Sequence, residues 1–308
     1  MSDRRDEADL ATFESLRPDM LSLAYRMLGD VGRAQDLVQE AWLRWHHRSD
    51  VEVDNPKAFL VTVVTRLCLN ELGAARVRHE ERSDRLPEPI DLAEAGIDRV
   101  DSLEQVSMAF LVLLERLTPP ERAVLLLHDV FDFPHEEIAK LVMRSAAGCR
   151  KLLERARHHV AEGRTMIRAS REEHARLLGA SVAAATRGDV AGLAELLAAD
   201  ALLITDGGRQ GRAVGRFRNL TQPLRGAEHI AAFVAATARE SGVRFVEREL
   251  NGQPALVFFR DGEPVGALLL AVAEGKVQRV FFHADRERLR FAATAAASAR
   301  RHPASRTP

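Results

Sequence analysis

The stretch from Leu117 to Val160 most constrains how this chain folds, because its helix signals and charge pattern fit one supersecondary motif. Thr118, followed by two prolines and Glu121, predicts a helix start with a capping box. Pro134 opens a second, short helix, and Ser145 caps a third helix after a tight turn. The third helix is apolar on one face and basic elsewhere, which predicts a helix-turn-helix whose last helix fits a DNA major groove. An ordinary αα-hairpin with a solvated basic face is the alternative.

Length and composition limit the number of domains and the classes of protein to which the chain can belong. The 308 residues suffice for two or three domains, and the net charge of -1 argues against a uniformly cationic nucleic-acid binder. Cys68 and Cys149 lie far apart on expected helix faces, so neither a disulfide framework nor a metal site is expected, and no cofactor is indicated. The charged start and the absence of a long apolar run predict neither a signal peptide nor a membrane span. These features together favour a cytoplasmic protein.

Residues 13–72 predict helices throughout. In the helix expected at 32–46, six apolar residues recur at helical spacing and form a core face: Ala34, Leu37, Val38, Ala41, Trp42 and Trp45. The opposite face carries Asp36, Gln39, Glu40 and Leu43. A solvated acidic stripe is the simple interpretation, but an apolar leucine in its middle is typical of a partner-binding helix.

The helix expected at 56–72 brings Arg66 and Asn70 onto one face, one turn apart. An arginine can anchor a backbone phosphate while an asparagine one turn away hydrogen-bonds a base edge. Arg76, Arg78 and Arg82 continue the positive charge. A solvent-facing pair is the alternative.

The chain resembles bacterial RNA polymerase sigma factors of the extracytoplasmic-function (ECF) group in the runs MLGDVGRAQDLVQEAW, NPKAFLVTVVTRLCLNEL and LTPPERAV, the last followed by HEEIAKLVMRSAAGCRKLLERAR. These runs match regions two and four of that group. The resemblance implies core RNA polymerase and promoter DNA as partners. It implies a polymerase contact at Asp36, Gln39, Glu40 and Leu43, and a minus-ten promoter contact at Arg66, Asn70 and residues 50–54. The implied minus-thirty-five contact falls on Arg144, Ser145, Ala146, Ala147, Arg150 and Lys151.

A proline segment and an extra domain complete the chain. Pro87 and Pro89 flank Glu88 and force extended backbone, which is a stiff spacer on the simple interpretation. After residue 175, helices give way to strands separated by Asn-Gly, Asp-Gly and Glu-Gly turns, which predicts an α+β fold. The order resembles the cone of SnoaL-like and nuclear-transport-factor-like (NTF2-like) proteins, and the proline segment resembles one of a sigma subgroup with such a domain.

That subgroup implies a regulatory contact between the proline segment and the cone domain. The residues implied are Pro87, Glu88, Pro89, Asp206, Gly207, Gly208, Asp285 and Arg286. Asp206, Gly207 and Gly208 match a DGG motif of the subgroup. The run His283-Ala284-Asp285-Arg286 departs from the subgroup's second motif, Asn-Pro-Asp-Lys. A small ligand inside the cone is a further expectation.

The sequence therefore predicts two all-α sigma domains and an α+β cone. The expected boundaries are 10–78 for region two, 79–102 for a linker, 103–165 for region four, 175–291 for the cone and 292–308 for a disordered tail. Two alternatives stay open. One is a helix-turn-helix regulator fused to a ligand-binding or catalytic cone, and the other is catalysis by Asp206, His229 and His283, although no tyrosine lies in this half of the chain.

Overall fold

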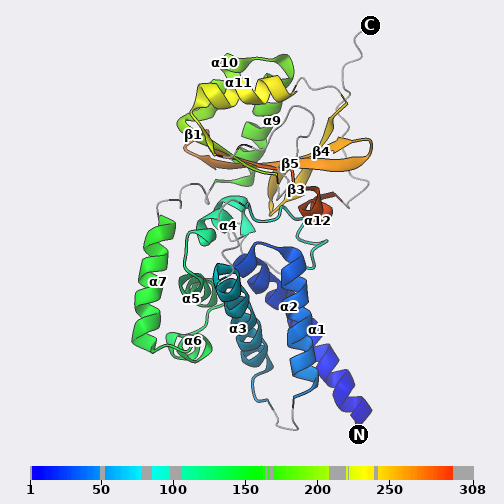
Figure 1. The fold of residues 1–308 in the computed structure, drawn as a ribbon, viewed down its shortest axis with the longest axis vertical. Helices are drawn as coiled ribbons and strands as arrows, with labels where there is room; N and C mark the ends of the chain where they lie inside the picture. The colour runs from blue at the N-terminus through cyan, green and yellow to red at the C-terminus, as the bar shows by residue number, and fades with distance from the viewer. Residues whose placement is uncertain are drawn as a thin grey trace. The chain divides into compact units, whose positions relative to one another are not determined.

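The computed structural model describes residues 2–48, 53–77, 85–97, 106–161, 163, 166, 169–207, 220, 222–238 and 242–293 (Figure 1). Residues 49–52, Arg78, Arg82, the rest of the linker at 79–84 and 98–102, Gly208 and the tail from 294 lie outside this part. The chain forms two compact units. The helical unit comprises Met1–Ser83, Gly96–Asp101 and Leu111–Glu162, and the sheet unit comprises Asp84–Ala95, Ser102–Phe110 and Gly163–Pro308.

The helical unit begins with three long helices, α1 (Ser2–Leu28), α2 (Val31–His46) and α3 (Pro56–Val77). Asp30 caps α2, because its carboxylate accepts a hydrogen bond from the backbone N–H of Arg33 at 2.9 Å. The core face expected on α2 is buried, except that Trp42 is only half-buried and packs against Phe13 with ring centroids 5.0 Å apart. This arrangement leaves the opposite face of α2 exposed.

Helix α4 (Met108–Glu115) is divided between the two units, and the second half of the helical unit contains α5 (Pro119–Asp129), α6 (His135–Leu141) and α7 (Ala146–Ala161). The predicted start of α5 is confirmed, since the Glu121 carboxylate accepts hydrogen bonds from both the N–H and the hydroxyl of Thr118. The buried Arg122 donates to the Met27 carbonyl at 2.6 Å, which ties α5 to α1. The helix-turn-helix therefore packs against α1 and α3.

Helix α3 is apolar and long enough over Pro56–Ala75 to span a membrane by length and composition alone. However, 44% of that window is buried within the protein, and Leu60, Val64 and Cys68 belong to the core. This burial is typical of a core helix. Cys68 and Cys149 are both free and buried.

The sheet unit packs three helices, α9 (Arg171–Arg187), α10 (Val190–Leu196) and α11 (Ala227–Ala238), on a six-stranded sheet (Figure 1). The strands are β1 (Leu197–Asp206), β2 (Leu224–Arg225), β3 (Arg244–Leu250), β4 (Gln253–Arg260), β5 (Glu263–Ala273) and β6 (Lys276–His283), in the order β2-β1-β6-β5-β4-β3. A 3₁₀ turn, η2 (Arg286–Arg288), and α12 (Arg290–Ala293) follow. The predicted fold class, two all-α parts and an α+β cone, is confirmed.

The three predicted hairpin turns are present between β3 and β6. Asn251-Gly252, Asp261-Gly262 and Glu274-Gly275 all have positive φ at both residues, as a type I′ turn requires. The meander from β3 to β6 is antiparallel, but β1 pairs with β6 in parallel. A parallel pairing needs a long crossover, so no turn signal could have indicated it.

Candidate functional site

The exposed face of α2 is built as the sequence predicts. Asp36, Gln39, Glu40 and Leu43 recur at helical spacing, and Leu43 is 49% exposed. Glu40 forms an ion pair with Arg44 one turn along, at 2.6 Å. The ion pair is exposed and contributes little to stability.

Arg66 on α3 is engaged by α6. Its Nη2 donates to the Lys140 carbonyl at 3.2 Å and its Nε to the Leu141 carbonyl at 3.4 Å. Both acceptors lie at the carboxyl end of α6, where the helix dipole adds negative potential that favours a cation. Asn70, one turn further along α3, is exposed. Arg66 therefore contacts another part of the helical unit in this structure.

The turn before α7 and the first turns of α7 carry the expected basic surface. Ser145 caps α7 by accepting from the Gly148 N–H at 3.0 Å, and a side chain at position 148 would meet that hydroxyl. Arg144, Arg150 and Lys151 are exposed, and Ala146 and Ala147 leave the helix start open to close approach. Arg150 has a distant acidic neighbour, Glu136, at 4.0 Å. The surface is accessible and positively charged.

An ion pair positions α7 against α5. Arg157 donates to both carboxylate oxygens of Asp129, at 3.0 and 2.5 Å. Burial alone would raise the pKa of Asp129, but hydrogen bonds from Arg157 and His128 lower it. The carboxylate therefore stays ionised and holds α7 in a fixed orientation.

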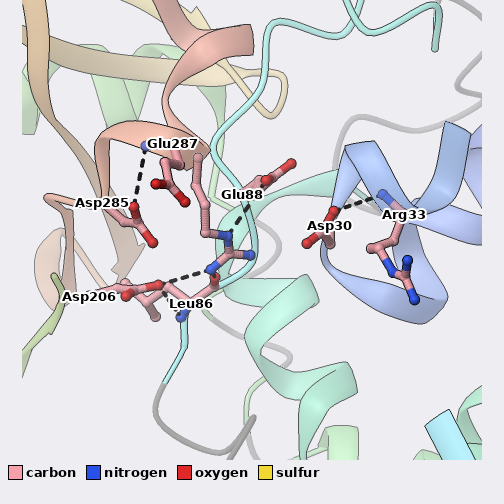
Figure 2. Close-up of polar contacts among 8 residues, drawn as sticks. Asp30, Arg33, Leu86, Glu88, Asp206, Asp285 and Glu287 are labelled. Carbon is pink, nitrogen blue, oxygen red and sulfur yellow. Dashed lines mark hydrogen bonds and ion pairs between the residues drawn. The ribbon is translucent and has the colours of Figure 1, made fainter. Parts of the chain in front are cut away.

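The proline segment at 86–90 binds the sheet unit, and all five of its residues are buried. The Leu86 N–H donates to the Asp206 carboxylate at 3.0 Å, and the Leu86 carbonyl accepts from Arg288 at 2.6 Å (Figure 2). Pro87 and Pro89 have no N–H, so burying an extended segment here leaves few donors to satisfy. The prolines thus both straighten the segment and make its burial less costly.

A buried cluster of three charges surrounds Leu86. Arg288 contacts the Asp206 carboxylate at 3.0 Å and the Glu88 carboxylate at 3.6 Å (Figure 2). The side chains of Asp206, Glu88 and Arg288 are 3%, 4% and 11% exposed. A buried charge without its partner is strongly unfavourable, so the cluster fixes where the segment docks more than it adds net stability.

A second attachment point lies at Ile90. Its N–H donates to the Asn251 side-chain carbonyl at 3.1 Å, and its own carbonyl accepts from the Asn251 N–H at 2.8 Å. One residue on, the Asp91 N–H donates to the Phe291 carbonyl at 2.9 Å. The segment is therefore attached at both ends.

Not every residue expected at this contact lies there. Asp206 contacts the segment, and Gly207 beside it is buried. Asp285 instead caps η2 by accepting a hydrogen bond from the Glu287 N–H, and Arg286 is exposed. The cation that reaches the segment is Arg288, and the sequence analysis missed both Arg288 and Asn251. The pattern gave no signal for Arg288 beyond its place after the last strand, and Asn251 was interpreted as a turn residue only.

His283 is buried close to the charge cluster, because it lies opposite Asp206 in the pairing of β6 with β1. Burial, with a smaller effect of the Arg288 charge, lowers its pKa to about 3. Its Nε2 has no hydrogen-bond partner among the described residues. A charged imidazole is therefore strongly disfavoured in the folded chain.

Acid should destabilise the sheet unit through His283. Its pKa is about 3 when folded and about 6.5 when unfolded, so below pH ~6.5 the unfolded chain binds more protons. The free energy of unfolding then falls as pH falls, by about 2 kcal/mol from this group at pH 5. We expect the stability difference between wild type and His283→Phe to change by this amount between pH 7.5 and 5.0 in calorimetric unfolding. A difference independent of pH would contradict the prediction.

Comparison with known proteins adds to this geometry. Residues 12–78 match the family model of sigma-70 region 2, and residues 107–160 match that of sigma-70 region 4. The chain is 30% identical over 274 residues to the probable ECF RNA polymerase sigma factor SigI of Mycobacterium tuberculosis, covering 88% of this chain and 91% of that protein. The chain is an ECF sigma factor. It is also 34% identical over 242 residues to SigJ of the same organism, covering 76% of this chain and 74% of SigJ.

The sigma factor also resembles a solved structure over nearly its whole length. The crystal structure of Mycobacterium tuberculosis SigJ superposes with a TM-score of 0.71 at 28% identity, covering 91% of this chain and 98% of that one. The match includes the sheet unit, so the arrangement of sigma regions followed by an α+β domain is shared. The family expected from the sequence is confirmed. An ordinary helix-turn-helix regulator, the alternative, would not contain region two.

Proposed function

We propose that this sigma factor binds core RNA polymerase through Asp36, Gln39, Glu40 and Leu43 and directs promoter-specific initiation. Arg66 and Asn70 on α3 would meet the minus-ten element. The turn before α7 and its start, from Arg144 to Lys151, would meet the minus-thirty-five element. Exposure of α2 and of the basic surface supports these assignments. Because the polymerase it serves works in the cytoplasm, we place the protein there.

The sheet unit is proposed to modulate this activity within the same chain. The observation that carries this proposal is the attachment of Leu86 to Asp206 and Arg288 and of Ile90 to Asn251. The segment belongs to the linker between regions two and four, so its docking would restrict how those regions are spaced. A tethered partner acts at an effective concentration of roughly millimolar, so even a weak contact would be mostly formed.

Inhibition is the net effect we propose. Arg66 cannot hydrogen-bond the carboxyl end of α6 and reach promoter DNA at once, so DNA binding requires these two bonds to break. A docked linker that favours the arrangement in which Arg66 hydrogen-bonds α6 would lower the fraction of molecules able to bind DNA. Promoter affinity would fall with that fraction. The opposite sign, in which docking holds the active spacing, remains the alternative outcome of the experiment.

Transcription by three forms tests the proposal: the full chain, a chain ending after Arg171, and the double variant Pro87→Ala, Pro89→Ala. Each alanine adds a buried N–H and loosens the extended backbone, so docking should weaken. We expect both altered forms to transcribe a cognate promoter more strongly than the full chain with core polymerase. Pro223→Ala, an exposed proline of the sheet unit, is the matched control. Equal activity of all forms would refute modulation by the sheet unit.

For the sheet unit itself we propose ligand binding without catalysis. Asp206 and His283 are buried in the strand pairing and His229 is exposed on α11, where its Nδ1 contacts the Arg225 carbonyl at 3.2 Å. None of the three lines the cavity of this unit among the residues that the structure describes. This separation supports a non-catalytic role. A ligand would change activity only if its affinity differs between docked and free states.

A further inference from the structure

The sheet unit encloses an apolar cavity of about 150 Å³ between its helices and its sheet. Side chains of α9, α10, α11 and strands β1 and β3–β6 line it. Thr186, Ala238 and Phe245 line the cavity and are also exposed, so the cavity is open to solvent. A cavity of this volume with apolar walls is large enough for a small aromatic molecule.

Aromatic rings form one wall of the cavity. Phe258 and Phe282 meet edge to face with centroids 5.8 Å apart, and Phe245 is 6.3 Å from Phe258. The two rings come together beside Gly266, where an added side-chain carbon would lie 3.0 Å from the Phe282 ring. The glycine thus allows a continuous phenylalanine surface, which favours stacking with an aromatic ligand.

The polar groups of the lining point to a neutral ligand. Among the described lining residues none is ionisable, so a charged molecule would lose its hydration without gaining a partner. The polar residues of the lining are Ser181, Thr186 and Thr237. Thr186 donates to the Val182 carbonyl and Thr237 to the Phe233 and Val234 carbonyls, so the two threonine oxygens keep lone pairs that can accept a hydrogen bond.

We propose that this cavity binds a neutral aromatic molecule of one or two fused rings that carries one N–H or O–H donor. The inference deepens the ligand role proposed above and rests on it. Binding is measured without polymerase, however, so failure here would leave the modulation by linker docking standing, and failure of that modulation would leave the binding site standing.

Isothermal titration calorimetry of the full chain with indole tests the site. We expect saturable binding of one indole with a Kd of about 0.1–1 mM, and at least ~10-fold weaker binding of indole-3-carboxylate, whose charge has no partner in the cavity. Ala185→Leu and Val234→Phe should each fill the cavity and remove indole binding. Ala183→Leu, exposed on the same helix α9, should bind indole like wild type.

Four outcomes would overturn the proposal, and the first three are no saturable heat with indole, equal affinity for the carboxylate, and unchanged indole binding in both filled variants. The comparison of neutral and charged probes needs no variant, so misfolding of one variant does not remove the test. Loss of indole binding in Ala183→Leu as well would place the site elsewhere and would also overturn it.

Discussion

Leu43→Arg is expected to abolish stable binding to core RNA polymerase while leaving the fold intact. Leu43 is the apolar centre of an otherwise polar exposed face of α2. An arginine there would bury a charge without a partner in the interface, which should weaken binding by about 2–4 kcal/mol, or roughly 30- to 1,000-fold. Co-purification and titration with core enzyme measure the loss.

Leu10→Arg is the matched control for this experiment, because Leu10 lies on α1 and is 47% exposed, close to the 49% of Leu43. It introduces the same charge at a similar exposure on a different helix. We expect it to bind core enzyme like wild type. Equal binding by both variants, or equal loss in both, would show that the α2 face is not the polymerase contact.

Arg288→Met should release the linker segment from the sheet unit. The substitution removes the cation that both buried carboxylates, Asp206 and Glu88, contact, and also the donor to the Leu86 carbonyl. Breaking a buried charge cluster in this way costs about 3–5 kcal/mol. Hydrogen–deuterium exchange of the amides at 86–91 should then accelerate by at least about 100-fold. Promoter-dependent transcription should change in the same direction as in the double proline variant.

Arg286→Met provides the control, since Arg286 is exposed in the same 3₁₀ turn and was the cation expected from the sequence. It should leave the exchange of residues 86–91 unchanged. If Arg286→Met accelerates exchange as much as Arg288→Met, the charge of the turn rather than the buried cluster holds the segment. No acceleration in Arg288→Met would remove the cluster from the docking contact.

Local signals in the sequence accounted for most of the elements. Capping residues, helical spacing and turn pairs predicted the start of α5, the cap of α7 and the three hairpins, because each is decided by neighbours within a few residues. The parallel pairing of β1 with β6 was not predictable in this way. It joins residues about eighty positions apart, as Asp206 opposite His283 shows.

The site residues likewise include some that local sequence signals predict and others that only tertiary packing decides. Exposure of Leu43 on one face of α2 follows from periodicity alone, so the sequence could predict it. Arg66, by contrast, has helical spacing typical of a free surface residue, yet it contacts the end of α6. Only tertiary packing decides that contact, just as it decides that Arg288 rather than Arg286 reaches the linker.

Position 251 imposes three structural requirements, and few amino acids meet all of them. Its φ of 52° lies in the left-handed region, which favours glycine, asparagine and aspartate. Its side-chain oxygen must accept from Ile90, which excludes glycine. It is fully buried, so the extra negative charge of aspartate would be unfavourable. These requirements together favour asparagine at this turn position, and comparisons of related chains that treat it as an interchangeable loop residue would overlook the side chain that attaches Ile90 to the sheet.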